Sequence, residues 1–218
     1  MNYLFSNKDL RRLITPLIFE QTLAITVGMA DTMMISSVGE AAISGVSLVD
    51  MINNLIFCIL AALATGGAVV TSQHIGARNY EKARKSAKQL LYAVILFSLF
   101  LTGFVLLFRL PLLKIFFGSI EENVMRNAII YFMISAVSFP FLAVYNACAA
   151  LFRSMGNSQI TLKVSILMNI INVAGNALCI FVFQMGVAGV AIPSLISRAF
   201  SLLISASKNL SNSLGQSS

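Results

Sequence analysis

Long apolar runs separated by short charged segments are the main feature of this chain. About twenty apolar residues are enough to cross a bilayer as a helix, and six windows of this kind occur along the sequence. They predict helices over residues 13–38, 46–73, 89–108, 127–152, 164–183 and 187–207. The last two come from one uncharged stretch that is too long for a single helix, and residues 184–189 offer a turn within it.

The two ends of the chain differ from these runs. Residues 1–12 are polar and basic, and the apolar run after them is too long for a signal peptide, so we expect a retained first helix. Residues 208–218 are rich in Ser, Asn and Gly, which predicts a disordered tail. Residues 13–207 are therefore expected to form one six-helix bundle.

Composition supports a membrane protein. Hydrophobic residues make up 58% of the 218 residues and charged residues only 11%, whereas soluble domains have about 25% charged residues. The net charge of +7 lies in short segments between apolar runs, which does not indicate nucleic acid as a partner. The lipid bilayer is the expected partner, and the fold class predicted is all-α and integral to the membrane.

Sequence motifs of enzymes are not found. The chain has no His-Glu-x-x-His, no Gly-x-Ser-x-Gly and no Walker loop. Its three cysteines lie inside apolar runs and its single histidine, His74, has no Cys or carboxylate at ligand spacing. We therefore expect no enzyme, no cofactor and no metal site.

Lys and Arg are distributed unevenly over the two sides of the predicted bundle. Twelve of fifteen, Arg198 among them, fall on one side, and Arg109, Lys114 and Arg126 fall on the other. Because basic residues remain on the cytoplasmic side, we expect a multi-pass protein of the cell inner membrane with both termini in the cytoplasm.

Two acids interrupt the first apolar run. Glu20 and Asp31 lie eleven residues apart, close to three helical turns, which places them on one face about 16 Å apart. An ionisable group in the bilayer usually faces a protein interior and marks an ion or substrate path. Pro16 removes a backbone hydrogen bond in the same helix and can kink it. A kinkable helix with a buried acid has the parts of a protonation-driven gate.

Asparagines form a stripe on the fifth predicted helix. Asn169, Asn172 and Asn176 are spaced by three and four residues and so share one face. They indicate either hydrogen bonds between helices or the wall of a polar cavity, and the sequence leaves both open. Asn53 lies one turn after Asp50 and either lines the same cavity or pairs near the outer surface, of which the second is favoured.

Four stretches of the chain carry a resemblance to a known family. Pro16 is followed fifteen residues later by Asp31, and the other three stretches are residues 64–79, 152–157 and 169–194. Together they resemble the N-terminal half of a MATE (multidrug and toxic compound extrusion) transporter. The resemblance implies one six-helix lobe of a twelve-helix fold. It also implies an antiporter that exports drug-like, often cationic compounds in exchange for H⁺ or Na⁺.

The same resemblance implies roles for individual residues. Asp31 falls on the carboxylate that couples transport to a cation, and Asn172, Asn176 and Ser194 fall on its hydrogen-bonded neighbours. Some family members carry Asp at the position of Asn176, and this sequence does not. Pro16 falls on the proline whose bending accompanies protonation in proposed mechanisms.

The length of the chain leaves several interpretations open. Only six helices are predicted, so we expect a fragment, a truncated product or a lobe that pairs with a second copy to replace the missing six-helix half. Two other functions compete with efflux: a flippase for lipid-linked oligosaccharides, and an inactive half without transport. A flippase would need a cationic cavity, whereas the interior acids Glu20 and Asp31 outnumber Arg198.

Overall fold

The computed structural model describes the backbone of residues 7–215 and the side chains of residue 11 and residues 14–205. Its helices are α1 (Asn7–Ser36), α2 (Glu40–Gly76), α3 (Tyr80–Phe117), α4 (Glu122–Ser154), α5 (Ser158–Ala177) and α6 (Ala188–Gly215), with a single π-helical turn η1 (Leu178–Val182) after α5. No strand occurs in residues 7–215, and the all-helical fold class is confirmed.

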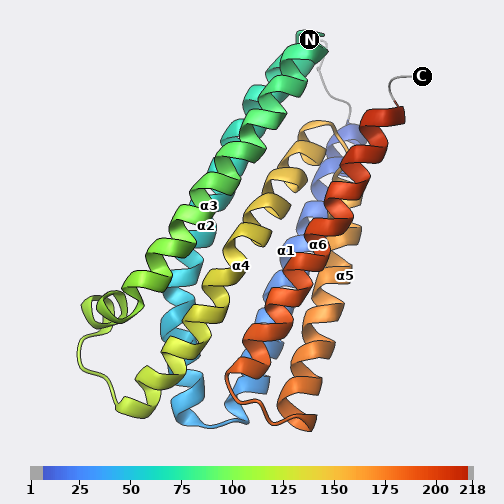
Figure 1. The fold of residues 1–218 in the computed structure, drawn as a ribbon. Helices are drawn as coiled ribbons and strands as arrows, with labels where there is room; N and C mark the ends of the chain where they lie inside the picture. Colours follow the sequence, from blue (N-terminus) through green and yellow to red (C-terminus); the bar gives the residue numbers. More distant parts are fainter. Residues whose placement is uncertain (1–6, 216–218) are drawn as a thin grey trace.

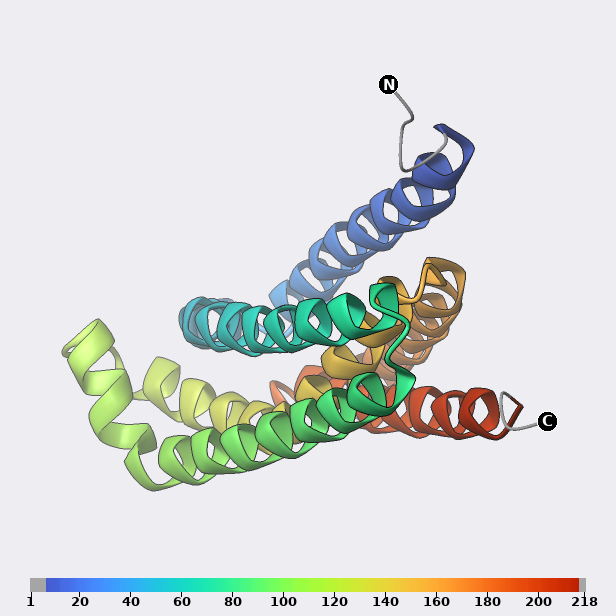
Figure 2. The same ribbon diagram turned by 90° about the horizontal axis from the view of Figure 1, so that it is seen from above.

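The helices form two groups joined by α4 (Figure 1). On one side α4 packs against the hairpin of α2 and α3, and on the other it packs against α6. The helix α5 lies between α6 and α1. Figure 2 shows that the N-terminal part of α1 projects away from α2 and α3, so α5 is the main neighbour of α1.

The connections alternate between the two ends of the bundle. The α2–α3 and α4–α5 turns lie at the end where α1 begins and α6 ends, and the other three connections lie at the opposite end (Figure 1). Arg78 and Lys163 are exposed at the first end, and Glu40 and Glu121 are exposed at the second. The charge asymmetry in the sequence therefore corresponds to two physical ends of one lobe.

Five helices are long and apolar enough to cross a membrane by length and composition. They are α2, α3, α4, α5 with its π turn, and the part of α6 up to Ser205. Among the described residues α1 does not meet this criterion. Its acids Glu20 and Asp31, together with Gln21 and several threonines, lower its mean hydropathy.

The observed helices extend beyond most of the apolar windows. Charged residues outside the windows, such as Lys82 and Lys88 before the window at 89–108, are themselves helical. Lipid solvation limits only the apolar middle of a helix, and its polar ends continue into the aqueous layer. The window that ended at Phe108 stops at a kink, where φ is −104° and ψ is 16°, and the helix resumes through Pro111 to Phe117. A proline that cannot donate to the preceding turn accounts for this kink.

The predicted tail, residues 208–218, follows directly on the last predicted helix. The helix α6 continues through them to Gly215, because Ser and Asn are tolerated in a helix that is already nucleated by a long apolar segment. The last three residues lie outside the described part. Likewise, part of the N-terminal segment 1–12 belongs to α1, which begins at Asn7.

Small residues set the distance between α2 and α4. A Cβ atom added at Gly45 would lie 2.9 Å from the backbone nitrogen of Ala128 and 2.9 Å from the carbonyl oxygen of Val124. Backbone atoms cannot move aside as a flexible side chain can. The glycine therefore permits a close approach of the two helices, as small residues do in membrane bundles.

We expect Gly45→Ala to destabilise the lobe by about 1–3 kcal/mol, because the added methyl group overpacks a backbone contact. Gly103→Ala is the matched control, since Gly103 is also helical and a Cβ there meets no atom within 4 Å. The control should be neutral or stabilising, because alanine is the better helix former. Thermal unfolding of both purified variants in detergent measures the difference, and equal midpoints would contradict the close α2–α4 packing.

Candidate cation site

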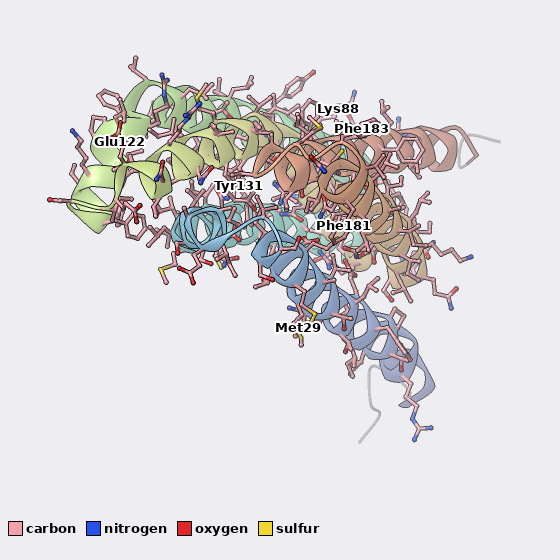
Figure 3. All side chains as sticks on the ribbon, turned by 90° about the horizontal axis from the view of Figure 1, so that it is seen from below. Met29, Lys88, Glu122, Tyr131, Phe181 and Phe183 are labelled. Atoms are coloured by element: carbon pink, nitrogen blue, oxygen red, sulfur yellow. The ribbon has the colours of Figure 1, made fainter. Side chains whose placement is uncertain are left out.

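Asp31 faces the interior of the lobe. Met29, two residues earlier, is 58% exposed and lies on the side of α1 that is turned away from the bundle (Figure 3). Two residues correspond to about 200° around a helix, so Asp31 points toward α5. Its side chain is partly buried there, in agreement with the expectation that an acid within a membrane helix avoids lipid.

A chain of hydrogen bonds connects Asp31 to α6. Asn176 Nδ2 donates to Asp31 Oδ1 over 2.7 Å and to Asn172 Oδ1 over 3.2 Å. Asn172 Nδ2 then donates to Ser194 Oγ over 2.8 Å, and Ser194 Oγ donates to the carbonyl oxygen of Val190. The structure thus brings Asp31, Asn172, Asn176 and Ser194 together from three helices.

Close packing of α5 and α6 makes this network possible. A Cβ atom added at Gly175 would lie 2.7 Å from Cβ of Pro193, one residue before Ser194. The two helices therefore approach each other where Asn172 meets Ser194. Directly after Asn176, the chain widens into the π turn Leu178–Val182, an irregularity that often occurs at functional sites.

One acceptor beside Asp31 is unsatisfied. Asn176 is fully buried, and its Oδ1 has no hydrogen-bond partner among the described residues. A buried polar atom without a partner costs about 1–3 kcal/mol. The site therefore has an oxygen that a proton donor, a water molecule or a cation would satisfy, next to a carboxylate that has the same requirement.

The remaining asparagine of the stripe belongs to a second polar cluster. Asn169 Nδ2 donates to Ser165 Oγ over 3.4 Å within α5. Glu20 on α1 lies 3.8 Å from the guanidinium of Arg153 at the end of α4, with Tyr145 also close to it. Glu20 and Asp31 are thus both turned into the lobe but have different partners.

Pro16 lies within a continuous helix. The backbone of α1 runs through it from Asn7 to Ser36 without a break. Its predicted role as a hinge remains a prediction, since a single conformation contains no second state of the helix.

The sequence reasoning did not predict that Asp50, Tyr131 and Arg198 lie together next to the Asp31 network. Tyr131 on α4 lies where that helix faces α2 (Figure 3), and its hydroxyl donates to Asp50 Oδ1 over 2.9 Å. Arg198 on α6 donates to Ser138 Oγ and stacks over the ring of Phe57 at 4.7 Å. The signal was available in the sequence, because Asp50 is an acid near the start of an apolar window.

From the sequence, Arg198 was counted with the basic cytoplasmic side and also weighed as an interior charge, and the first of these two uses was wrong. It lies in the middle of α6, against Phe57 of α2 and Ser138 of α4, where it counts as an interior charge and not as a topogenic one. Asn53 also lies inside the lobe, 2% exposed, beside the carboxylate of Asp50 and not at the outer surface.

The hydrogen bonds of Asn176 should contribute measurably to stability. We expect Asn176→Leu to destabilise the protein by about 1–2 kcal/mol, because both Asp31 and Asn172 lose a donor. Asn54→Leu is the matched control, since Asn54 is exposed on α2, and it should be neutral or stabilising. Unfolding of the two variants in a denaturing detergent, measured by the loss of helical circular dichroism, compares their stabilities. Equal stabilities would contradict the hydrogen-bond network.

The comparisons with known proteins agree with this geometry. Residues 16–178 match the family model MatE. The chain is 31% identical to an uncharacterized transporter, YisQ, of Bacillus subtilis over 193 residues, which are 86% of this chain and 42% of YisQ. It is 28% identical to a probable multidrug resistance protein, NorM, of Thermotoga maritima over 88% of this chain and 42% of NorM.

The fold also matches solved structures. A MOP superfamily transporter from Pyrococcus furiosus superposes with a TM-score of 0.86 at 22% identity, over 91% of this chain and 44% of that one. The chain thus spans less than half the length of the relatives that it matches, which corresponds to one lobe. The match to the family model covers most of the sequence, and the chain belongs to the MatE family of membrane transporters.

Proposed function

We propose that this chain forms one lobe of an ion-coupled antiporter that exports cationic organic compounds, with Asp31 as the coupling carboxylate. One observation carries the proposal. Inside the lobe, Nδ2 of Asn176 donates a hydrogen bond to Asp31. The amide oxygen of the same residue, Oδ1, is buried and has no hydrogen-bond partner among the described residues. A carboxylate beside an unsatisfied oxygen is a place where a proton or a small cation can be bound and released.

The coupling follows from charge. An ionised Asp31 attracts a cation, and a protonated Asp31 does not. If the proton or Na⁺ and the exported cation compete for the same carboxylate, the binding of one lowers the affinity for the other, and this effect is reciprocal. An antiporter requires this competition.

The interior charges favour a cationic substrate. Asp31 and Asp50 outnumber Arg198 in the middle of the lobe, and Glu20 is paired with Arg153 near one end. A lipid-linked oligosaccharide carries pyrophosphate and would need an excess of positive charge. The name of the Thermotoga relative, a probable multidrug resistance protein, also supports the export of drug-like compounds.

A second six-helix half is expected to complete the transporter. The helices carry many large apolar side chains that are exposed on the isolated lobe, such as Leu96 at 73%, Leu107 at 75% and Phe181 at 59%. Lipid and a second lobe are the environments that accept such a surface. We propose that the second lobe comes from a longer chain or from a second copy of this one.

We propose that the protein lies in the inner membrane with both termini in the cytoplasm. In a background in which Cys58, Cys148 and Cys179 are replaced, single cysteines at Glu40 and Glu121 should react with impermeant maleimide from outside the cell. Those at Arg78 and Lys163 should react only after permeabilisation. All four positions are exposed, so the reverse pattern would disprove the orientation and not merely indicate poor access.

Asp31→Asn should reduce pH- or Na⁺-driven export to background in the complete transporter. An asparagine oxygen still accepts the hydrogen bond of Asn176, so folding and expression should be retained while the exchangeable charge is lost. Export of a fluorescent cation from proteoliposomes, driven by an imposed ion gradient, measures the effect. Glu40→Gln is the control, because it removes an exposed acid at the end of the bundle, and it should leave the rate unchanged. Normal, gradient-dependent export by Asp31→Asn would exclude the coupling role.

A further inference from the structure

Beside the Asp31 network lies a second buried acid that the proposed function does not use. Asp50 on α2 is partly buried and accepts the hydroxyl of Tyr131, whose side chain is 9% exposed. It lies close enough to Asp31 for the two carboxylates to repel each other. Two acids in one low-dielectric region are costly unless positive charge compensates both.

Arg198 compensates only one of them. Its guanidinium interacts electrostatically with both Asp31 and Asp50, yet it is held by Ser138 Oγ and by the ring of Phe57. Within the described residues it forms no ion pair of 4.0 Å or less with either carboxylate. Arg198 is therefore a fixed positive charge that interacts with two acids, and it is not the dedicated partner of either.

Counting charges shows a deficit. When both carboxylates are ionised, the group of Asp31, Asp50 and Arg198 carries two negative charges and one positive charge. Electroneutrality in a buried site then requires one more positive charge. The titratable groups that interact with Asp50 come from three elements: Asp31 from α1, Tyr131 from α4 and Arg198 from α6. None of these supplies a second fixed cation.

Unsatisfied oxygens lie beside both acids. Asn53, one turn after Asp50 and 2% exposed, lies against the Asp50 carboxylate and has a buried Oδ1 without a hydrogen-bond partner among the described residues. Beside Asp31, Asn176 Oδ1 is likewise buried without a hydrogen-bond partner among the described residues. Each acid is thus accompanied by a buried amide oxygen that lacks a donor, and a proton or a small monovalent cation would satisfy both requirements.

We propose that Asp50 is a second cation-accepting carboxylate of the lobe and that Arg198 is the fixed counter-charge which leaves room for a single exchangeable positive charge, shared between Asp50 and Asp31. This inference rests on the proposed function of Asp31 and adds two residues to it. The exchangeable charge is a proton or Na⁺. An incoming organic cation takes its place, and the charge of the group is unchanged by the exchange.

The experiment counts protons released per protein when tetraphenylphosphonium binds to the complete transporter. Isothermal titration in two buffers of different ionisation enthalpy, in sodium-free choline medium, gives that number. The wild type should release one proton. Asp50→Asn should release none, because Asp31 and Arg198 then neutralise each other. The new asparagine still accepts the hydrogen bond from the hydroxyl of Tyr131, which preserves the fold.

Removal of the fixed counter-charge should restore the exchange. The double variant Asp50→Asn with Arg198→Gln should again release one proton, now from Asp31 alone. The matched control, Asp50→Asn with Arg198→Lys, keeps the positive charge and should still release none. Glu40→Gln removes an exposed acid at the end of the bundle, outside this group, and it should behave as the wild type does.

Each result has a defined meaning. Release of one proton by Asp50→Asn would overturn the role of Asp50 while leaving that of Asp31 intact, and so would failure of Arg198→Gln to restore release. Unchanged release by Asp31→Asn would overturn the proposed function itself. If the wild type releases one Na⁺ in sodium medium and no proton, with the same pattern across the variants, the exchangeable charge is Na⁺ and the proposal stands. Release of neither ion by the wild type would overturn it.

Discussion

A carboxylate that lies between membrane helices must be solvated by the protein, because the hydrocarbon around it offers no hydrogen bonds. Asp31 meets this constraint through Asn176, which is held in turn by Asn172, and Asn172 by Ser194. Three helices are thereby fixed relative to one another by a single acid. A change in the charge of Asp31 would alter the strength of the hydrogen bonds that hold α1, α5 and α6 in this arrangement. In the proposed function, a proton or cation at this residue would influence the conformation of the lobe in this way.

Glycines determine whether such a network can form at all. Side-chain amides and hydroxyls are short, so they meet across two helices only where the backbones approach closely. Gly175 against Pro193 provides that approach between α5 and α6, and Gly45 against Ala128 provides it between α2 and α4, one to two turns from Asp50 and Tyr131. In both places a glycine permits the close packing of two helix backbones, as small residues do in membrane bundles, and polar contacts between the same helices form nearby.

The fold could be predicted largely from the sequence, and the site only in part. Apolar windows identified all six helices because lipid imposes a minimum length of apolar residues, but their ends were misplaced wherever charged residues continued the helix, as at Lys82. The asparagine stripe indicated one face of α5, because helical spacing is a local property. Tyr131 and Asp50 are 81 residues apart in the sequence. Their hydrogen bond depends on how α2 and α4 pack, which no local pattern encodes. Arg198 lies in the middle of the helix predicted over residues 187–207, and counting it with the basic residues of the cytoplasmic side was inconsistent with that prediction; its contacts with Phe57 and Ser138 show that it is an interior charge.

The two groups of charged residues inside the lobe differ in their net charge. Near one end, Glu20 is compensated by Arg153, so this pair is neutral without any mobile ion. In the middle, Arg198 faces two acids, and the group is neutral only with one further positive charge. Glu20 and Asp31 lie on the same helix α1, about 16 Å apart along its axis, yet only the group around Asp31 has an uncompensated charge. Because a buried net charge is costly, the mobile cation that we propose for this group could be replaced by another cation but could not easily leave without a replacement. In the proposed antiporter, that constraint would couple the release of one cation to the arrival of another, which antiport requires of a binding site.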